Sequence, residues 1–152
     1  MKIIVFSDSH GNIGPMLAAV SHYKPDMILH LGDHIWDADC FKKMSIPMRR
    51  VRGNCDFGSV DIENDTVVIN GIRIIMTHGH RYTVKAGLGP LMNLGRSAKA
   101  DILLFGHTHI PLREEREGIV LMNPGTAGVG RQITCGLLRL GEDGIDGEIV
   151  AI

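Results

Sequence analysis

Short runs of apolar residues, each closed by a polar residue or a glycine, recur along this chain. Runs of this length are typical of buried β-strands. The pattern predicts strands at residues 2–6, 26–31, 48–52, 73–77 and 101–105. Each of these strands ends at a polar segment, usually with a glycine that lets the backbone turn or approach another segment closely.

Helical spacing appears between the first three strands. Met16, Leu17 and Val20 would share the buried side of a helix that Asn12 can cap and that ends near Tyr23. A second helix is predicted over residues 38–44, before the third strand. A β-α-β-α-β order implies parallel strands joined by right-handed crossovers.

The second half of the chain has a different pattern. Asn70-Gly71 between apolar runs at 66–69 and 73–76 is the strongest short-range signal for a β-hairpin, so the sheet is mixed. A helix over 84–99 is expected to be interrupted, because it contains three glycines and a proline. Further strands are predicted at 112–116, 119–122, 133–140 and 145–152, with turns at 117–118 and 142–144.

Composition narrows the class of protein. With 152 residues and 44% hydrophobic content, the chain can bury one substantial core, so we expect one domain over residues 1–152. A net charge of −1 without blocks of like charge gives no strong nucleic-acid signature and no membrane surface. The chain shows no leader-like segment and no apolar stretch of ~18 residues, which predicts a cytoplasmic protein. Three cysteines without a C-x-x-C spacing argue against disulfides and structural zinc.

Potential metal ligands follow the predicted strands. Taken alone, each has a bland interpretation: an aspartate near a helix start, an asparagine in a turn, a pair of exposed loop histidines. Together they form a set of two Asp, one Asn and four His, which suits divalent transition metals. Seven ligands are too many for one ion and fit two ions that share one ligand. The seven are Asp8, His10, Asp33, Asn54, His78, His107 and His109.

The order of these motifs resembles a known signature. Asp8-x-His10, Gly32-Asp33, Gly53-Asn54, His78 and Gly106-His107-x-His109 resemble, in that order, the motifs of the calcineurin-like metallophosphoesterases. Asn123-Pro-Gly-Thr and Arg131 extend the resemblance to the small YfcE-like phosphodiesterases. The resemblance implies an α/β fold in which two mixed β-sheets pack face to face with flanking helices, a four-layer αββα sandwich.

The resemblance also implies roles for the seven residues. Two divalent metal ions are expected, of Mn, Ni, Co, Zn or Fe, with Mn favoured. Asp8, His10 and His109 would hold the first ion, Asn54, His78 and His107 the second, and Asp33 would bridge them. The implied reaction is attack on phosphorus by a hydroxide that bridges the metals, so that Asp33, Asn54 and His78 act through the ions.

The function expected from this resemblance is hydrolysis of a phosphate ester, most specifically a phosphodiester. A phosphomonoesterase or nucleotidase on the same site is one alternative. The other is a non-catalytic scaffold that resembles the metallophosphoesterase-like subunit of retromer. A scaffold does not require seven intact ligands, which ranks it below an enzyme. The physiological substrate, the native metal and the formation of a homo-oligomer stay open.

Cys55 departs from the pattern of the superfamily. Much of the superfamily has histidine after Gly-Asn, and that residue is thought to protonate the leaving group or contact the phosphoryl oxygens. A thiol carries no positive charge when it is protonated. Cys55 is therefore a possible substrate contact, with weaker assistance to the leaving group.

The remaining polar residues have several candidate roles. His22 is expected on a solvated helix face, and His30 near the site beneath the ligands. His34 and His80 could contact the substrate or transfer protons. Asp37 and Asp56 could orient neighbouring groups or accept turn hydrogen bonds. Asn123–Gly125 and Arg131 could shape the rim of the cavity.

Overall fold

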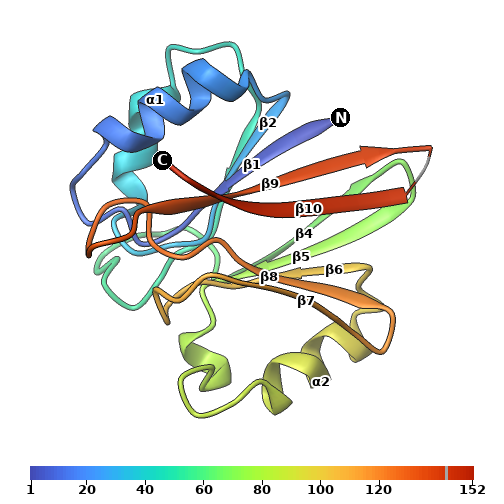
Figure 1. The fold of residues 1–152 in the computed structure, drawn as a ribbon. Helices are drawn as coiled ribbons and strands as arrows, with labels where there is room; N and C mark the ends of the chain where they lie inside the picture. Colours follow the sequence, from blue (N-terminus) through green and yellow to red (C-terminus); the bar gives the residue numbers. More distant parts are fainter. Residues whose placement is uncertain (143) are drawn as a thin grey trace.

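Two five-stranded β-sheets pack face to face, and helices cover their outer faces (Figure 1). The computed structural model describes residues 1–142 and 144–152. Both sheets are mixed, so the fold class predicted from the sequence is confirmed. The turn predicted at 142–144 includes Asp143, which lies outside the described residues.

The first sheet has the order β10-β9-β1-β2-β3. Strand β1 pairs in parallel with β2, and β2 pairs in parallel with β3, as the β-α-β-α-β order predicted. The C-terminal hairpin of β9 and β10 joins antiparallel to β1. The strands are β1 (Lys2–Phe6), β2 (Met27–His30), β3 (Met48–Arg50), β9 (Thr134–Gly141) and β10 (Gly144–Ala151).

The second sheet has the order β4-β5-β6-β8-β7. Its strands are β4 (Asn64–Ile69), β5 (Ile72–Thr77), β6 (Ile102–Leu104), β7 (Leu112–Arg116) and β8 (Ile119–Asn123). The predicted hairpin is confirmed: Ile69 pairs with Ile72 across the turn. Asn70 and Gly71 have φ of 51° and 82°, the left-handed pair that a two-residue hairpin requires.

Successive side chains along the strands alternate between the core between the two sheets and a core between a sheet and its helices. In β1, Ile3 and Val5 face the layer between the sheets, whereas Ile4 and Phe6 pack under the helices. In β6, Ile102 and Leu104 face the same central layer. Burial on both faces explains why these strands are continuous apolar runs in the sequence. It also holds their C-terminal ends in fixed positions.

Four helical segments lie outside the sheets: α1 (Gly14–Tyr23), the 3-10 helices η1 (Ile35–Phe41) and η2 (His80–Tyr82), and α2 (Gly89–Ser97). The prediction that Asn12 caps α1 is wrong. Ile13 occupies the cap position without a side-chain bond, and the Asn12 amide donates to the Gly128 carbonyl at 3.1 Å. Pro15 in the first turn makes a side-chain cap less necessary.

The other helix predictions need correction at their starts. The helix predicted at 38–44 is the 3-10 helix η1, which begins at Ile35, where the backbone N–H bonds to Asp56. The helix predicted over 84–99 is confined to α2. Thr83 and Gly87 have φ of 50° and 150°, which a right-handed helix does not accept. No helix among the described residues combines the length and apolar character needed to cross a bilayer.

Candidate metal centre

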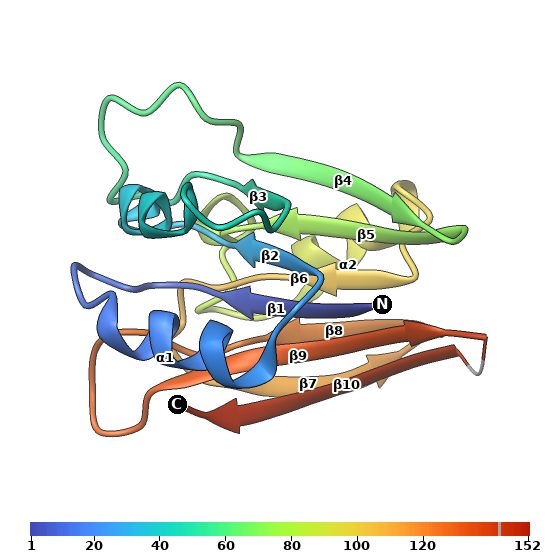
Figure 2. The same cartoon turned by 90° about the horizontal axis from the view of Figure 1, so that it is seen from above.

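The loops after β1, β2, β3, β5 and β6 carry all seven residues predicted as ligands. In Figure 2 the arrowheads of β1, β2 and β5 point to the same side of the molecule, where these loops gather. Backbone hydrogen bonds join the loops to one another. Asp8 N–H donates to the Gly32 carbonyl, and Gly106 N–H donates to the His78 carbonyl, each at 3.0 Å. These bonds join the loop after β1 to the loop after β2, and the loop after β5 to the loop after β6.

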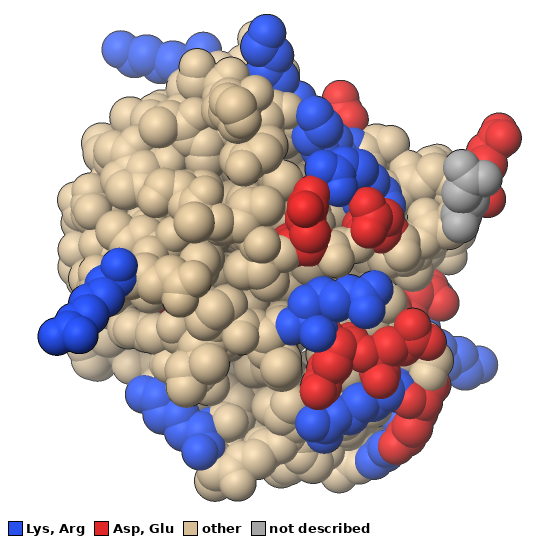
Figure 3. All heavy atoms as spheres, in the orientation of Figure 1, with Lys and Arg blue, Asp and Glu red and all other residues tan. Residues whose placement is uncertain are grey.

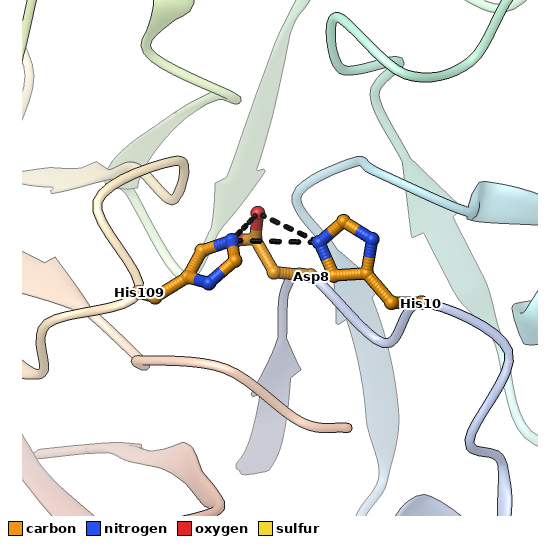
Figure 4. A group of neighbouring side chains, drawn as sticks. All are labelled: Asp8, His10 and His109. Carbon is orange, nitrogen blue, oxygen red and sulfur yellow. Dashed lines mark hydrogen bonds and ion pairs between the residues drawn. The ribbon is translucent and has the colours of Figure 1, made fainter. Parts of the chain in front are cut away.

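Asp8, His10 and His109 form a first group whose potential ligand atoms all lie within 4.8 Å of one another (Figure 4). Asp8 Oδ1 is 3.0 Å from His109 Nε2 and 3.9 Å from His10 Nε2. The two Nε2 atoms are 3.4 Å apart. Three ligand atoms thus face one point between the loops after β1 and β6.

Asp33, His78 and His107 form a second group of the same kind. His78 Nε2 lies 3.4 Å from Asp33 Oδ2 and 3.1 Å from Asn54 Oδ1, so Asn54 belongs to this group as a neutral oxygen. His78 Nε2 also lies 4.0 Å from Asp8 Oδ1, which connects the second group to the first. The structure brings all seven predicted residues together.

The chemistry of these atoms fits divalent cations. Asp8 Oδ1 is buried and has no hydrogen-bond partner, and His109 approaches it at an ion-pair distance without hydrogen-bond alignment. A buried carboxylate oxygen without a donor is costly unless a cation compensates it. The imidazole nitrogens and carboxylate oxygens around it are the donors that Zn²⁺ and similar ions accept.

Neighbouring backbone fixes the orientation of His78. Its Nδ1 lies 2.9 Å from the Leu31 carbonyl, and a carbonyl can only accept, so Nδ1 carries the proton of the neutral ring. The lone pair is then on Nε2, which faces Asp33 and Asn54. Burial lowers the pKa of His78, but bonding to Asp33 and the charge of Asp8 outweigh it, so the pKa is raised overall. A cation would have to displace the proton that Nε2 carries when the His78 ring is charged, so cation binding would depend on pH.

The two carboxylates keep their charge. Burial raises the pKa of Asp8 and of Asp33, but nearby histidines outweigh burial in both cases. The pKa of Asp8 is lowered by His109 and His78, and that of Asp33 by His78 and the Cys55 backbone N–H. Both residues are therefore anionic at neutral pH.

Asp56 supports the loop that carries Asp33. Its carboxylate accepts from the N–H groups of Asp33 (2.9 Å), Gly53 (2.7 Å) and Ile35 (3.0 Å). Of the two roles considered for Asp56, orienting a neighbour and accepting turn hydrogen bonds, the structure shows both. A Cβ on Gly53 would lie 2.6 Å from Asp33 N, so only glycine fits between these loops.

His30 and Asp37 support the loop that carries Asp8 and His10. Asp37 accepts from Ser9 Oγ and Gly11 N–H, both at 2.7 Å. His30 is fully buried; its Nε2 lies 3.3 Å from Ser9 Oγ in that loop, and its Nδ1 accepts from Gly32 N–H at 3.2 Å. Burial lowers the pKa of His30 to about 4, so its ring is neutral at pH 7. The expectation that His30 lies near the site beneath the ligands is confirmed.

Asn123 supports the loop that carries His107 and His109. Its amide donates to the Gly106 carbonyl and to Thr108 Oγ1, both at 3.0 Å. Asn123 is fully buried, so it acts beneath the cavity and not at its rim. Two other supports had no signal in the sequence: the Leu31 carbonyl beneath His78, and the Thr126 hydroxyl, which donates to the Asp8 carbonyl at 2.9 Å.

The other histidines and Arg131 lie around the site or away from it. His34 is exposed, with its ring centroid 5.0 Å from that of His10. The ring of His80 is 5.4 Å from that of His78, and its Nδ1 is buried without a hydrogen-bond partner. His22 and Arg131 are exposed. His22 packs edge-on against Tyr23 at the end of α1, as a solvated helix face predicts.

Cys55 lies beside the second group. Its backbone N–H donates to Asp33 Oδ1 at 2.8 Å, and its Sγ is 3.4 Å from Asn54 Nδ2. Burial and the neighbouring Asp33 raise the pKa of the Cys55 thiol to about 11. The side chain is therefore neutral at pH 7, which agrees with the absence of positive charge inferred from the sequence.

Charged side chains are unevenly distributed on the face drawn in Figure 3. Asp and Glu lie on the right of the molecule among Lys and Arg, whereas the left, where the loops lie in Figure 1, shows isolated Lys and Arg among uncharged atoms.

Sequence comparisons place the chain among phosphoesterases. A model of the calcineurin-like phosphoesterase superfamily domain matches residues 1–143. A protein of Mycoplasma pneumoniae named probable metallophosphoesterase is 31% identical over 133 residues, which are 86% of this chain and 81% of that protein. Phosphodiesterase YfcE of Escherichia coli K12 is 30% identical over 127 residues, which are 78% of this chain and 60% of YfcE.

Solved structures agree on the fold. A conserved protein of Streptococcus pneumoniae TIGR4, described as a predicted phosphoesterase, matches with a TM-score of 0.85 and 26% identity, over 99% of this chain and 88% of that one. Vps29 of Entamoeba histolytica, solved with Zn²⁺, matches with a TM-score of 0.82 over 99% of each chain. The identity to Vps29 is 21%, so that likeness shows the fold alone.

Proposed function

The chain belongs to the calcineurin-like phosphoesterase superfamily, and from that premise we propose that it is a single-domain, metal-dependent phosphodiesterase. One observation carries the proposal. Two adjacent groups of carboxylate and imidazole side chains share a buried Asp8 oxygen that has histidine nitrogens at ion-pair distance but no hydrogen-bond partner. Such an arrangement costs stability in the absence of cations and is useful for binding them.

In this proposal each group of ligands holds one divalent cation. Asp8, His10 and His109 would hold the first, Asn54, His78 and His107 would hold the second, and Asp33 would contribute to both. Mn is the favoured metal, with Ni, Co, Zn or Fe as alternatives, because imidazole-rich sites disfavour hard ions such as Ca. When bound, a pair of cations supplies positive charge for the phosphoryl oxygens and lowers the pKa of water enough to give hydroxide at neutral pH.

The protein residues position the phosphate. Two carboxylates only partly neutralise two divalent cations, so the cavity attracts an anionic ester. His78, held through Nδ1 by the Leu31 carbonyl, keeps Nε2 directed to its cation. Asp33 is fixed through Cys55 N–H and Asp56, so its carboxylate cannot turn away. A rigid set of ligands of this kind would hold the cations where their charge stabilises the negative charge that builds up on the phosphoryl oxygens.

Diesters are the preferred class because position 55 carries a neutral thiol. A monoester dianion has one more negative charge than a diester, and a cationic side chain here would help to hold it and protonate its leaving group. Cys55 offers neither. The relative YfcE is named a phosphodiesterase, which supports the same class.

Fewer observations support the two alternative functions. A phosphomonoesterase or nucleotidase would use the same seven residues and differ in substrate preference. A protein-binding scaffold like Vps29 shares the fold at 21% identity, but a scaffold does not need a complete set of ligands.

Matched kinetics test the proposal. We expect the Mn²⁺-loaded protein to hydrolyse bis(p-nitrophenyl) phosphate with a higher kcat/KM than p-nitrophenyl phosphate, and to be slow with alkyl leaving groups. Cys55→His should raise the monoesterase rate relative to the diesterase rate, whereas Cys55→Ala should cost little. A preference of the wild type for the monoester would contradict the diesterase assignment. If the metal-loaded protein hydrolysed neither ester, the proposal that it is an enzyme would be contradicted.

A further inference from the structure

A second cavity, mostly apolar, adjoins the candidate metal centre. It has a volume of about 470 Å³, and its apolar lining comes from Val84, Leu88, Phe105, Ile110 and Leu112. Ile110 is 68% exposed although it is a large apolar side chain. We refer to this hollow as the apolar cavity.

The loop after β6 contributes to both the apolar cavity and the metal centre. Phe105, Thr108 and Ile110 line the cavity, and they alternate along the chain with His107 and His109, which belong to the two ligand groups. Asn123 holds this loop through Thr108 Oγ1. A molecule bound at the ligands would therefore have the apolar cavity within reach of one of its ends.

Lys85 lies at the boundary between the cavity and the centre. It is exposed and lines the apolar cavity together with Thr108 and Ile110, the two residues that flank His109 in the sequence. Within the part of the chain that the structure describes, no carboxylate forms an ion pair with Lys85.

The cavity on the other side of the centre has different chemistry. Arg52, Asn54, His80 and Arg81 line it, and Glu63 forms ion pairs with Arg52 at 2.8 Å and Arg81 at 3.0 Å. Apart from Phe57, its lining consists of polar residues and glycines, so an apolar group of a substrate would gain fewer apolar contacts there than in the apolar cavity. The two sides of the metal centre thus differ in the groups that they accept.

We propose that the apolar cavity is a subsite for one aromatic or otherwise flat apolar arm of a phosphodiester, with Lys85 at its rim pairing with the phosphate. The inference rests on the proposed phosphodiesterase function and specifies its substrate class. The volume is sufficient, since a cavity of about 150 Å³ lined by Leu, Ile and Phe accommodates benzene. A diester with two small polar arms would leave the cavity unused and bind more weakly.

Binding of diester analogues whose variable arm is joined to phosphorus through carbon, and whose only ester carries a poor methyl leaving group, tests this subsite. The probes are methyl methylphosphonate, methyl phenylphosphonate and methyl 1-naphthylphosphonate, which carry the same charge and differ in one arm. Calorimetric titration of the Mn²⁺-loaded protein should give a Kd that falls at least about 10-fold from the methyl to the naphthyl compound, and burial of apolar area is the physical reason.

Two variants locate the effect. Ile110→Ser should remove most of the preference for the naphthyl arm, and Lys85→Met should weaken all three probes by a similar factor. Val68→Ser, at another exposed apolar position on β4, is the matched control and should leave all Kd values unchanged. A wild-type protein with equal Kd for the three probes, or an Ile110→Ser protein with its preference intact, overturns the subsite.

Turnover of bis(p-nitrophenyl) phosphate is measured on the same samples. If the wild type prefers the naphthyl probe, Ile110→Ser abolishes that preference and no turnover is seen, the result supports the apolar subsite and refutes the proposed activity. Turnover without any preference among the probes supports the activity and refutes the subsite. The two proposals therefore fail in different measurements.

Discussion

Backbone conformation at single residues shows that the site is held under strain. Asp8, His10, Asp33, His107 and His109 all have φ between 45° and 68°, the left-handed region. Asp and His enter this region more readily than most residues, yet each such residue costs of order 1 kcal/mol or more. The fold tolerates the cost because left-handed backbone at these points turns five side chains towards two small volumes.

Asp33 is the residue whose change should matter most. Asp33→Asn keeps the size of the side chain but removes the charge proposed to serve both cations. We expect the rate to fall by at least about 10² and the content of both metals to drop, whereas His109→Ala should reduce one metal more than the other. Elemental analysis and kinetics on the two variants distinguish these results. A near-normal rate with unchanged metal content in Asp33→Asn would contradict its assignment.

His30 should make the metal-free protein sensitive to mild acid. Its pKa falls from 6.5 to about 4 on burial, so the ring binds a proton in the unfolded chain at a pH where the folded protein excludes it. The contribution of the neutral His30 ring to the free energy of unfolding is fully present above pH 6.5. About 3 kcal/mol of it is lost as the pH falls towards 4. Urea unfolding at pH 7 and pH 4.5 measures the loss. His30→Gln should unfold more easily at pH 7 but lose less stability between the two pH values. An equal loss in both proteins would exclude His30 as the cause.

At the scale of elements, the site depends on how closely the loops after neighbouring strands approach. The loops after β2 and β3 meet at Gly32 and Gly53, where a Cβ on Gly32 would lie 2.5 Å from Gly53 N. The loops after β1 and β6 meet at Gly106, where a Cβ would lie 2.9 Å from Asp8 Oδ2. These glycines are needed for contact between loops, not only for turning the chain.

Gly53→Ala tests the contact between the loops after β2 and β3. The added methyl group would push Asp33 away from Asp56, and we expect a loss of about 1–3 kcal/mol of stability together with reduced metal binding. Gly141→Ala is the control, because a Cβ there meets no atom within 4 Å. Thermal unfolding with and without Mn²⁺ measures both effects. Equal metal-dependent stabilisation in wild type and Gly53→Ala would contradict this role for the loop contact.

Elements that depend on neighbouring residues were predicted correctly, whereas element starts that depend on distant residues or unusual backbone conformations were not. The hairpin at Asn70-Gly71 was predictable because two adjacent residues determine its turn. The strands were predictable because burial on both faces makes them apolar throughout. The starts of η1 and α2 were not, because they depend on the distant Asp56 carboxylate and on left-handed backbone at Thr83.

At the scale of the whole molecule, metal binding should couple to stability. We expect two divalent cations per chain, measured by elemental analysis, and complete but reversible loss of hydrolysis on chelation. Mn, Ni, Co or Zn should restore activity better than Ca. At about 100 times Kd, a ligand that binds only the folded state adds about 2.7 kcal/mol per site, so the melting temperature should rise by several degrees. Full activity after exhaustive dialysis against EDTA, with no metal detected, would refute the metal-dependent mechanism.

The sequence by itself determined the architecture and the identity of the candidate ligands. Apolar runs that end in Asp, His or Asn defined both the strands and the residues at their ends, because strand propensity and side-chain chemistry are local properties. The resemblance carried by those residues specified the sandwich of two sheets and the division of the seven ligands.

Only the tertiary structure decided what surrounds the ligands. The contact of His78 with the Leu31 carbonyl and the hydrogen bonds from Asp33 N–H and Ile35 N–H to Asp56 join residues that are 21 to 47 positions apart. The buried Asp8 oxygen has no hydrogen-bond partner among the described atoms. The apolar cavity likewise combines residues 84–88 with residues 105–112. Sequence patterns carry no record of such contacts, because they arise only when separate strand ends meet at one side of the packed sheets.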